Sequence, residues 1–224
     1  MIGTKAKGLS LILKSIVMVC AVIGIVLSAL AGAQSFMGGN RVLMYFTIQS
    51  NIVIALICAA GSVLLLQNRE ISDRWHTVKF VFTVSITLTG VVFCFVLAPT
   101  LGKYAWNAQN VLTHVVVPIA AVLDFFVTAR YGSIRRRNVL YVTIPPLLYA
   151  IYAGIAYAAR WEFSRGVHYP YFFLNWGSPA GAFGFTDTLP FMGCVWWIAL
   201  ILLFLLGVGF AYLRILNAMK KRIS

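Results

Sequence analysis

The chain has 224 residues, of which 61% are hydrophobic and only 10% are charged, and its formal net charge is +13. Soluble domains of this length carry about 25% charged residues and do not group their apolar residues into long blocks. The basic excess does not indicate nucleic-acid binding, because Lys and Arg lie in short loops and tails between apolar blocks and not on one soluble face. Composition and charge therefore indicate an integral membrane protein and exclude nucleic acid as a partner.

Six apolar blocks follow one another along the chain, and each is long enough to cross the hydrocarbon core of a bilayer as a helix. The first block has a basic start, but its apolar run continues for about 20 residues without a clear cleavage site, so it is interpreted as a span and not as a signal peptide. The sequence predicts an all-α integral membrane protein, a six-transmembrane-helix bundle that forms a single domain over residues 1–224. The predicted spans are 11–33, 43–66, 78–98, 108–128, 139–159 and 190–213.

Lysine and arginine are distributed unevenly between the two sides of these blocks. Fourteen lie on the side of the termini, namely Lys5, Lys7, Lys14, Arg69, Arg74, Lys79, Arg130, Arg135, Arg136, Arg137, Arg214, Lys220, Lys221 and Arg222. Four lie on the other side, namely Arg41, Lys103, Arg160 and Arg165. Because basic loops stay in the cytoplasm, both termini are predicted to be cytoplasmic, and 34–42, 99–107 and 160–189 to face outward.

The second predicted span begins with an unusual polar patch: Thr47, Gln49, Ser50 and Asn51 put four polar side chains into five residues. The fourth span contains His114, the one histidine inside a predicted span. Both spans run inward, and helix rise places Thr47 roughly 6 Å and His114 roughly 9 Å below the outer ends of their helices. The two side chains are therefore expected at one level, where they meet if their helices touch.

A threonine beside a histidine is the smallest set of groups that performs acyl transfer, because the hydroxyl is a poor nucleophile until a base takes its proton. We therefore consider Thr47 a candidate nucleophile and His114 its base. Asn51, one turn after Thr47, is a candidate donor to an oxyanion, and Asn110, one turn before His114, a candidate to orient the ring. For both asparagines the alternative is a structural hydrogen bond between helices. Gln49 and Ser50 are further oxyanion or orienting candidates.

Three short motifs occur in order: "YFTIQSN" (45–51), "HVVVP" (114–118) followed by "LD" (123–124), and "YPYFFLNWG" (169–177). Together they resemble the androgen-induced-gene and androgen-dependent-TFPI-regulating protein family, especially its bacterial six-span relatives. The resemblance implies six spans with cytoplasmic termini and a threonine hydrolase that splits fatty acid esters of hydroxy fatty acids. It implies Thr47 as nucleophile and His114 as base. Asn175 departs from the family pattern, in which an acidic residue often follows the leucine.

The long outward segment 160–189 is rich in aromatic residues. Such residues favour the headgroup layer, so the segment is either an interfacial belt or a lid over a cavity through which a lipid tail enters. The candidates for substrate access are Tyr169, Tyr171, Phe172, Phe173 and Trp176. His168 and Asp187 are expected in solvent. Asp124, about 15 Å along the helix from His114, is expected to pair with a cytoplasmic arginine.

The main hypothesis is an intramembrane lipid-ester hydrolase whose partners are the bilayer and a membrane lipid or fatty-acyl ester, in a bacterial cytoplasmic membrane. It needs no cofactor and no metal. A bis-histidine haem needs two deep histidines where the spans supply one, and Cys20, Cys58, Cys94 and Cys194 form no C-x-x-C pair. The alternatives are a small transporter or channel, which the lack of an internal repeat and of buried charge disfavours, and a non-catalytic scaffold. The sequence does not fix the oligomeric state.

Overall fold

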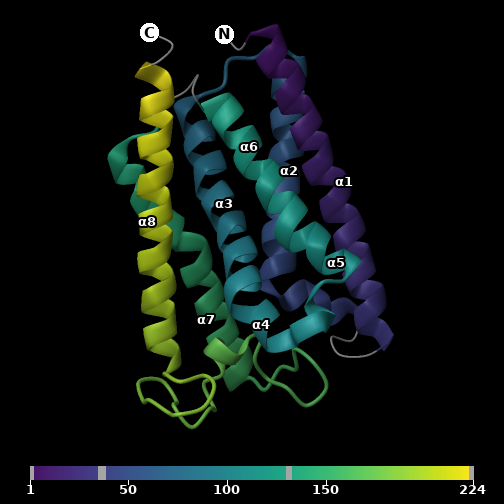
Figure 1. Cartoon of the computed structure of the whole chain (residues 1–224), viewed down its shortest axis with the longest axis vertical. Helices are drawn as coiled ribbons and strands as arrows, with labels where there is room; N and C mark the ends of the chain where they lie inside the picture. The colour runs from purple at the N-terminus through teal and green to yellow at the C-terminus, as the bar shows by residue number, and fades with distance from the viewer. Residues whose placement is uncertain (1–2, 35–38, 130–132, 222–224) are drawn as a thin grey trace.

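Six long apolar helices form an up-and-down bundle in the computed structural model, which describes residues 3–34, 39–129 and 133–221 (Figure 1). The predicted six-helix all-α class is confirmed. Helix α1 begins and α8 ends at the same end of the bundle, and the long aromatic segment lies at the other end (Figure 1). The spanning helices are Thr4–Gly32, Phe46–Leu66, Asp73–Ala105, Ala108–Ala129, Arg136–Ala158 and Cys194–Lys221.

These spans are built from shorter elements. The first two are α1 (Thr4–Gln34) and α2 (Phe46–Leu66), and the last is α8 (Cys194–Lys221). The third consists of α3 (Asp73–Val92), the π-helical turn η2 (Phe93–Leu97), α4 (Ala98–Leu101) and η3 (Gly102–Ala105). The fourth consists of α5 (Ala108–Val111), the π-helical turn η4 (Leu112–Val116) and α6 (Val117–Ala129), and the fifth of the 3₁₀ helix η5 (Arg136–Thr143) and α7 (Ile144–Ala158). Short 3₁₀ helices η1 (Gly39–Met44) and η6 (Phe172–Leu174) lie in connecting segments.

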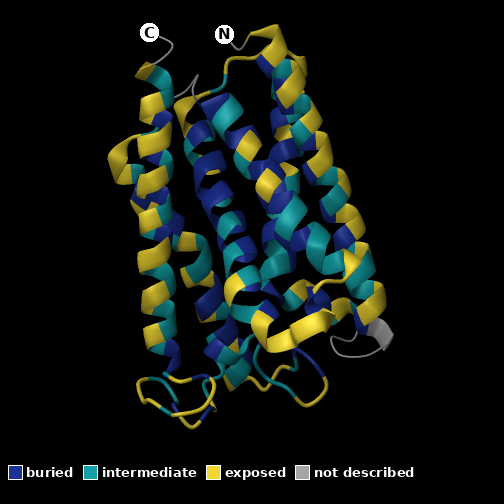
Figure 2. Ribbon diagram, viewed as in Figure 1, coloured by how far each residue is buried: buried dark blue, intermediate teal, exposed yellow. Residues whose placement is uncertain are grey.

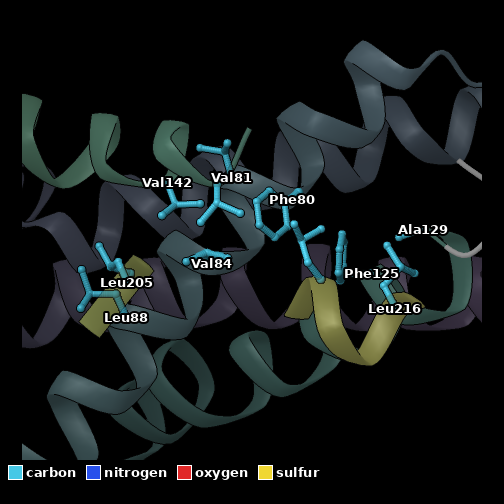
Figure 3. Close-up of a cluster of buried hydrophobic side chains, with 11 residues drawn as sticks. Phe80, Val81, Val84, Leu88, Phe125, Ala129, Val142, Leu205 and Leu216 are labelled. Atoms are coloured by element: carbon cyan, nitrogen blue, oxygen red, sulfur yellow. The ribbon is translucent and has the colours of Figure 1, made fainter. Parts of the chain in front are cut away.

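Helix α3 is the central element of the bundle. It is the most buried of the six spans, whereas α8 is the most exposed (Figure 2). On one side α3 packs with α2 and α6, and on the other with η5 and α8. The largest apolar cluster joins α3, α6, η5 and α8 through residues such as Phe80, Phe125, Val142 and Leu205 (Figure 3). Apolar side chains on the outside of the bundle face the region that lipid occupies in a membrane.

The predicted boundaries of three spans need correction, and the first of these spans begins at Thr4 and not at residue 11. The third span starts at Asp73 and not at residue 78, so His76 lies in a helix and is buried. His114 is therefore not the one histidine inside a span. The sixth helix begins at Cys194 and reaches Lys221, which is later at both ends than the predicted 190–213. Hydropathy misses such ends, because polar residues extend a helix beyond its apolar stretch.

Two prolines explain the two π-helical turns. In both cases a proline is the second residue after the turn: Pro99 follows η2 and Pro118 follows η4. A proline has no N–H for the carbonyl four residues earlier, and that carbonyl belongs to Phe95 or His114. The residues before the prolines bond instead to the carbonyls five residues back, Ala98 to Phe93 and Val117 to Leu112. The helices thus widen beside His114, and π turns are frequent at functional sites.

The proline pair of the fifth span begins an α-helix. Pro145 and Pro146 occupy the first turn of α7, where a missing N–H costs no intrahelical bond. The residues before them form the 3₁₀ helix η5. The fifth span therefore changes from 3₁₀ to α geometry at the prolines.

A buried ionic cluster joins α1, α3 and α6. Lys14 Nζ lies 2.6 Å from Asp124 Oδ1, Lys79 Nζ pairs with Asp124 Oδ2, and Ser10 and Thr128 bond to the same groups. All five side chains are at most 3% exposed. The expectation that Asp124 pairs with a cytoplasmic arginine is wrong. Its partners are Lys14 and Lys79, two lysines that were counted with the loops and tails. The expectation that the spans lack buried charge is therefore also wrong.

Candidate active site

Thr47 lies in the first turn of α2. Tyr45 is the residue before the helix, in extended conformation, and its carbonyl accepts the N–H groups of Ile48 and Gln49. The N–H groups of Phe46 and Thr47 precede the regular helical bonds, as the first donors of any helix do. Thr47 N–H donates to the Tyr171 hydroxyl at 3.3 Å. The candidate nucleophile thus lies at the positive end of a 21-residue helix, where developing negative charge is stabilised.

His114 meets Thr47 as the sequence analysis expected. Its Nε2 lies 3.2 Å from Thr47 Oγ1. Its Nδ1 lies 3.0 Å from the backbone carbonyl oxygen of Asn110, an atom that only accepts hydrogen bonds. Nδ1 therefore carries the hydrogen in the neutral ring, and Nε2 has a free lone pair for the Thr47 hydroxyl hydrogen. This is the tautomer that a general base needs.

The imidazole is held between two helices. The ring of Phe93 stacks on it with centroids 3.9 Å apart and planes at 21°. Gly90, one turn before Phe93 on α3, lets the two helices approach, since a Cβ there would lie 2.8 Å from the carbonyl oxygen of His114. His114 is only 8% exposed. Both π turns thus contribute to the site, one carrying His114 and the other Phe93.

Tyr171 is the third side chain at the site. Its hydroxyl lies 3.4 Å from Thr47 Oγ1 and also accepts the Thr47 N–H. The ring is fixed by an edge contact with Tyr45 at 5.9 Å and by stacking on Phe173 at 5.0 Å. Burial raises the pKa of the Tyr171 phenol, so it stays protonated at neutral pH and can donate a hydrogen bond. The sequence analysis placed Tyr171 with the access residues, and its only signal was the conspicuous "YPY" of the outer segment.

The four side chains predicted to stabilise the oxyanion or to orient His114 form hydrogen bonds with other partners. Asn51 is fully buried and gives its two amide hydrogens to the carbonyls of Thr47 and Thr113, which is the structural alternative. The side chain of Asn110 bonds to Ala105 O, so this residue orients His114 through its backbone carbonyl and not through its amide. Ser50 donates to the Thr47 carbonyl and pairs with Thr89, and Gln49 donates to Leu43 O. None of these four side chains forms a hydrogen bond with the Thr47 hydroxyl, whereas Ser50 and Asn51 bond to the Thr47 carbonyl.

Two cavities meet at Thr47 and Tyr171. The first is an open outer cavity of about 660 Å³ between α1, α2, the π turns and the aromatic segment, and it contains His114. The second is a narrow crevice of about 60 Å³ with an almost entirely apolar lining, formed by α2, α3, α7, α8 and η6. Of the predicted access residues, Tyr169, Tyr171 and Phe172 line the outer cavity, and Tyr171 and Phe173 line the crevice.

Trp176 lines neither cavity and lies against Gly154 of α7, so it is not an access residue in this structure. His168 contacts the Trp161 carbonyl, and neither His168 nor the exposed Asp187 reaches His114. The aromatic segment is thus more than a belt at the headgroup level. It supplies one hydroxyl of the site and part of the walls of both cavities.

No family model, no curated protein and no solved structure matches this chain. Its class therefore follows from fold and site: a multi-pass, six-helix membrane protein with a partly buried threonine–histidine–tyrosine cluster at the junction of a wide cavity and a narrow apolar crevice.

Proposed function

We propose that the protein is an intramembrane hydrolase of lipid carboxylic esters, with Thr47 as nucleophile and His114 as general base. The observation that carries this proposal is the 3.2 Å contact between Thr47 Oγ1 and His114 Nε2, in a ring whose Nδ1 hydrogen is committed to the Asn110 carbonyl. Nucleophilic catalysis requires a hydroxyl beside a base, and a further group that holds the base in the correct orientation.

In the first step, Thr47 Oγ1 attacks the ester carbonyl carbon while its proton passes to His114 Nε2. The carbonyl electron pair moves to oxygen, and the Tyr171 hydroxyl and the first-turn N–H groups of α2 stabilise the oxyanion. Collapse of this intermediate breaks the bond to the alcohol oxygen, which takes the proton from His114. Water then attacks the acyl carbonyl carbon while His114 takes its proton, and collapse of this second intermediate breaks the bond to Thr47 Oγ1, which regains the proton from His114 as the fatty acid leaves.

The two cavities suggest how such a substrate is held. The crevice has an almost entirely apolar lining that includes Thr47, which suits the first methylenes of an acyl chain next to the ester carbon. The outer cavity is wider and has polar groups such as Asn107 and Gln109 on its wall, which suits a bulkier leaving alcohol. The partner is therefore a membrane lipid or other fatty-acyl ester that reaches the site from the bilayer.

The sequence resemblance supports the same assignment. The motif residues that imply a threonine hydrolase, Thr47 of "YFTIQSN" and His114 of "HVVVP", are the two that contact each other. The family's known substrates make fatty acid esters of hydroxy fatty acids the first compounds to test. The excess of basic residues at the end that holds both termini supports cytoplasmic termini, and the resemblance to bacterial six-span relatives supports a bacterial cytoplasmic membrane.

Covalent labelling with a fluorophosphonate, together with hydrolysis of a long-chain ester, tests this proposal in the purified full chain. Thr47→Ala is expected to abolish both signals, and His114→Ala to reduce both at least about 100-fold. The double variant should be no worse than the single ones, because the residues act as one unit. Thr47→Ser should keep partial activity, since it retains the hydroxyl.

Ser50→Ala is the matched control. Its hydroxyl lies one turn from Thr47 but pairs with Thr89, so labelling should persist. Labelling that persists in Thr47→Ala and is lost in Ser50→Ala would identify Ser50 as the nucleophile. Hydrolysis that neither Thr47→Ala nor His114→Ala affects would exclude the assignment.

A second candidate function is a small transporter, and one observation favours it. The Lys14–Asp124–Lys79 cluster is a set of buried charges inside the membrane-spanning region, a common mark of ion and solute pathways. It lies ten residues along the fourth span from His114, roughly 15 Å away. Proton or solute flux into vesicles that is lost in Asp124→Asn but kept in Thr47→Ala would favour the transporter.

A further inference from the structure

An open groove of about 760 Å³ lies at the end of the bundle opposite Thr47. Its walls are the first turns of α3 and the 3₁₀ helix η5, both of which begin at the end where α1 starts and α8 stops (Figure 1). The two walls run in the same direction. The Asn138 amide bridges them through a 2.8 Å bond to Thr77 Oγ1.

The mouth of the groove is basic. Arg74, Arg135 and Arg137 line it and are exposed, and Asp73 is the one acidic side chain in its lining. Asp73 Oδ1 already accepts the Ser133 N–H at 2.9 Å. Among the residues that the structure describes, none of the ion pairs involves the three arginines. Three guanidinium groups against one carboxylate leave two positive charges for an anionic group.

The groove becomes apolar away from its mouth. On α3 the lining passes from Arg74 to Val78 and then to Phe82, eight residues or roughly 12 Å further. Along η5 it passes from Arg137 to Ile144, the first residue of α7, seven residues or roughly 14 Å at the rise of a 3₁₀ helix. Val78 and Ile144 are exposed although they are apolar. The sequence of basic, then polar, then apolar surface matches a phospholipid from phosphate to ester to acyl chain.

We propose that this groove binds an anionic phospholipid of the surrounding bilayer. The phosphate lies between the arginines, whose planar guanidinium groups pair with phosphate oxygens in a bidentate manner. The glycerol esters lie near Thr77 and Asn138, and one acyl chain follows Val78 and Phe82. Basic pockets between spanning helices at the cytoplasmic side are suited to such head groups. This site is separate from Thr47 and does not depend on its chemistry.

Native mass spectrometry of the full chain in detergent, titrated with short-chain phosphatidylglycerol and with the matching phosphatidylcholine, tests the proposal. We expect the anionic lipid to bind at least tenfold more tightly. The double variant R74A/R137A should lose roughly tenfold or more of that affinity. The matched double variant R69A/R214A removes two exposed arginines outside the groove and should bind as the unchanged protein does.

Val78→Trp fills the apolar part of the groove without changing its charge, and should also weaken the lipid. Equal affinity for the two lipids, or equal losses in the two arginine variants, would overturn the proposal. Competition with inorganic phosphate and with glycerol 3-phosphate distinguishes a lipid head group from a soluble phosphate as the ligand. If either displaces the lipid at equal concentration, the site takes a soluble phosphate and the lipid proposal is wrong. Thermal unfolding of each variant identifies losses that come from misfolding.

Discussion

At the scale of single residues, the structure gives Tyr171 a role that its place in the chain does not reveal. Its hydroxyl contacts both Thr47 Oγ1 and Thr47 N–H, whereas the sequence only suggested a wall of aromatic rings. The sequence did predict the Thr47–His114 contact, because helix rise and span direction fix the depth of a side chain. It did not predict which groups orient His114, since a backbone carbonyl has no signature in the sequence.

Tyr171→Phe is expected to lower kcat for ester hydrolysis by about 100-fold with little change in KM, because it removes one donor to the oxyanion and keeps the ring. Phe172→Ala is the control: this ring lines the outer cavity without touching Thr47, so it should raise KM more than it lowers kcat. Steady-state kinetics on a long-chain ester distinguish the two effects. A normal kcat in Tyr171→Phe would remove the phenol from the mechanism.

At the scale of elements, the site depends on two helices that approach each other at their π turns. Pro99 and Pro118 widen the helices, and Gly90 lets α3 touch the backbone of His114. A residue without a side chain is required at position 90, because a Cβ there would lie 2.8 Å from the carbonyl oxygen of His114. The two π turns were not predicted from the sequence, although Pro99 and Pro118 are their physical causes.

Gly90→Ala is expected to destabilise the fold by about 1–3 kcal/mol and to reduce esterase activity, because the new methyl group would force His114 away from its position. Gly207→Ala is the matched control. Gly207 is a helical glycine on α8 with nothing within 4 Å of an added Cβ, so alanine there should stabilise by about 0.5–1 kcal/mol. Thermal unfolding and hydrolysis of both variants give the comparison. A Gly90→Ala protein as stable and active as Gly207→Ala would show that this contact does not hold the site.

The ionic cluster fixes the relative position of α1, α3 and α6. Asp124→Asn is expected to cost about 3–5 kcal/mol, because Lys14 and Lys79 would keep their charges in a buried site without a carboxylate. Replacing all three residues with Met, Leu and Met should recover most of this loss, since no buried charge remains. Asp187→Asn, at an exposed carboxylate, should have no effect. Unfolding in detergent measures the series, and an Asp124→Asn protein of normal stability would contradict the role of the cluster.

At the scale of the whole molecule, the distribution of charge predicts the orientation of the bundle in the membrane. Lys14 and Lys79 are buried and do not belong in the loop count, but twelve basic residues against four still favour the end that holds both termini. Reporter fusions after Arg136 should therefore be cytoplasmic, and fusions after Gly166 should lie outside. The opposite result would invert the orientation and place the Thr47 site in the inner leaflet.

The sequence by itself determined the number of spans, their order and the level shared by Thr47 and His114. These features follow from hydropathy and helix rise, which are properties of a continuous stretch of chain. Only the tertiary structure decided that Tyr171 reaches Thr47, that the Asn51 amide is occupied, and that Asp124 pairs with Lys14 and Lys79. The physical reason is that a buried polar group takes whichever partner the packing of distant helices brings within hydrogen-bond distance, and no local pattern records that choice.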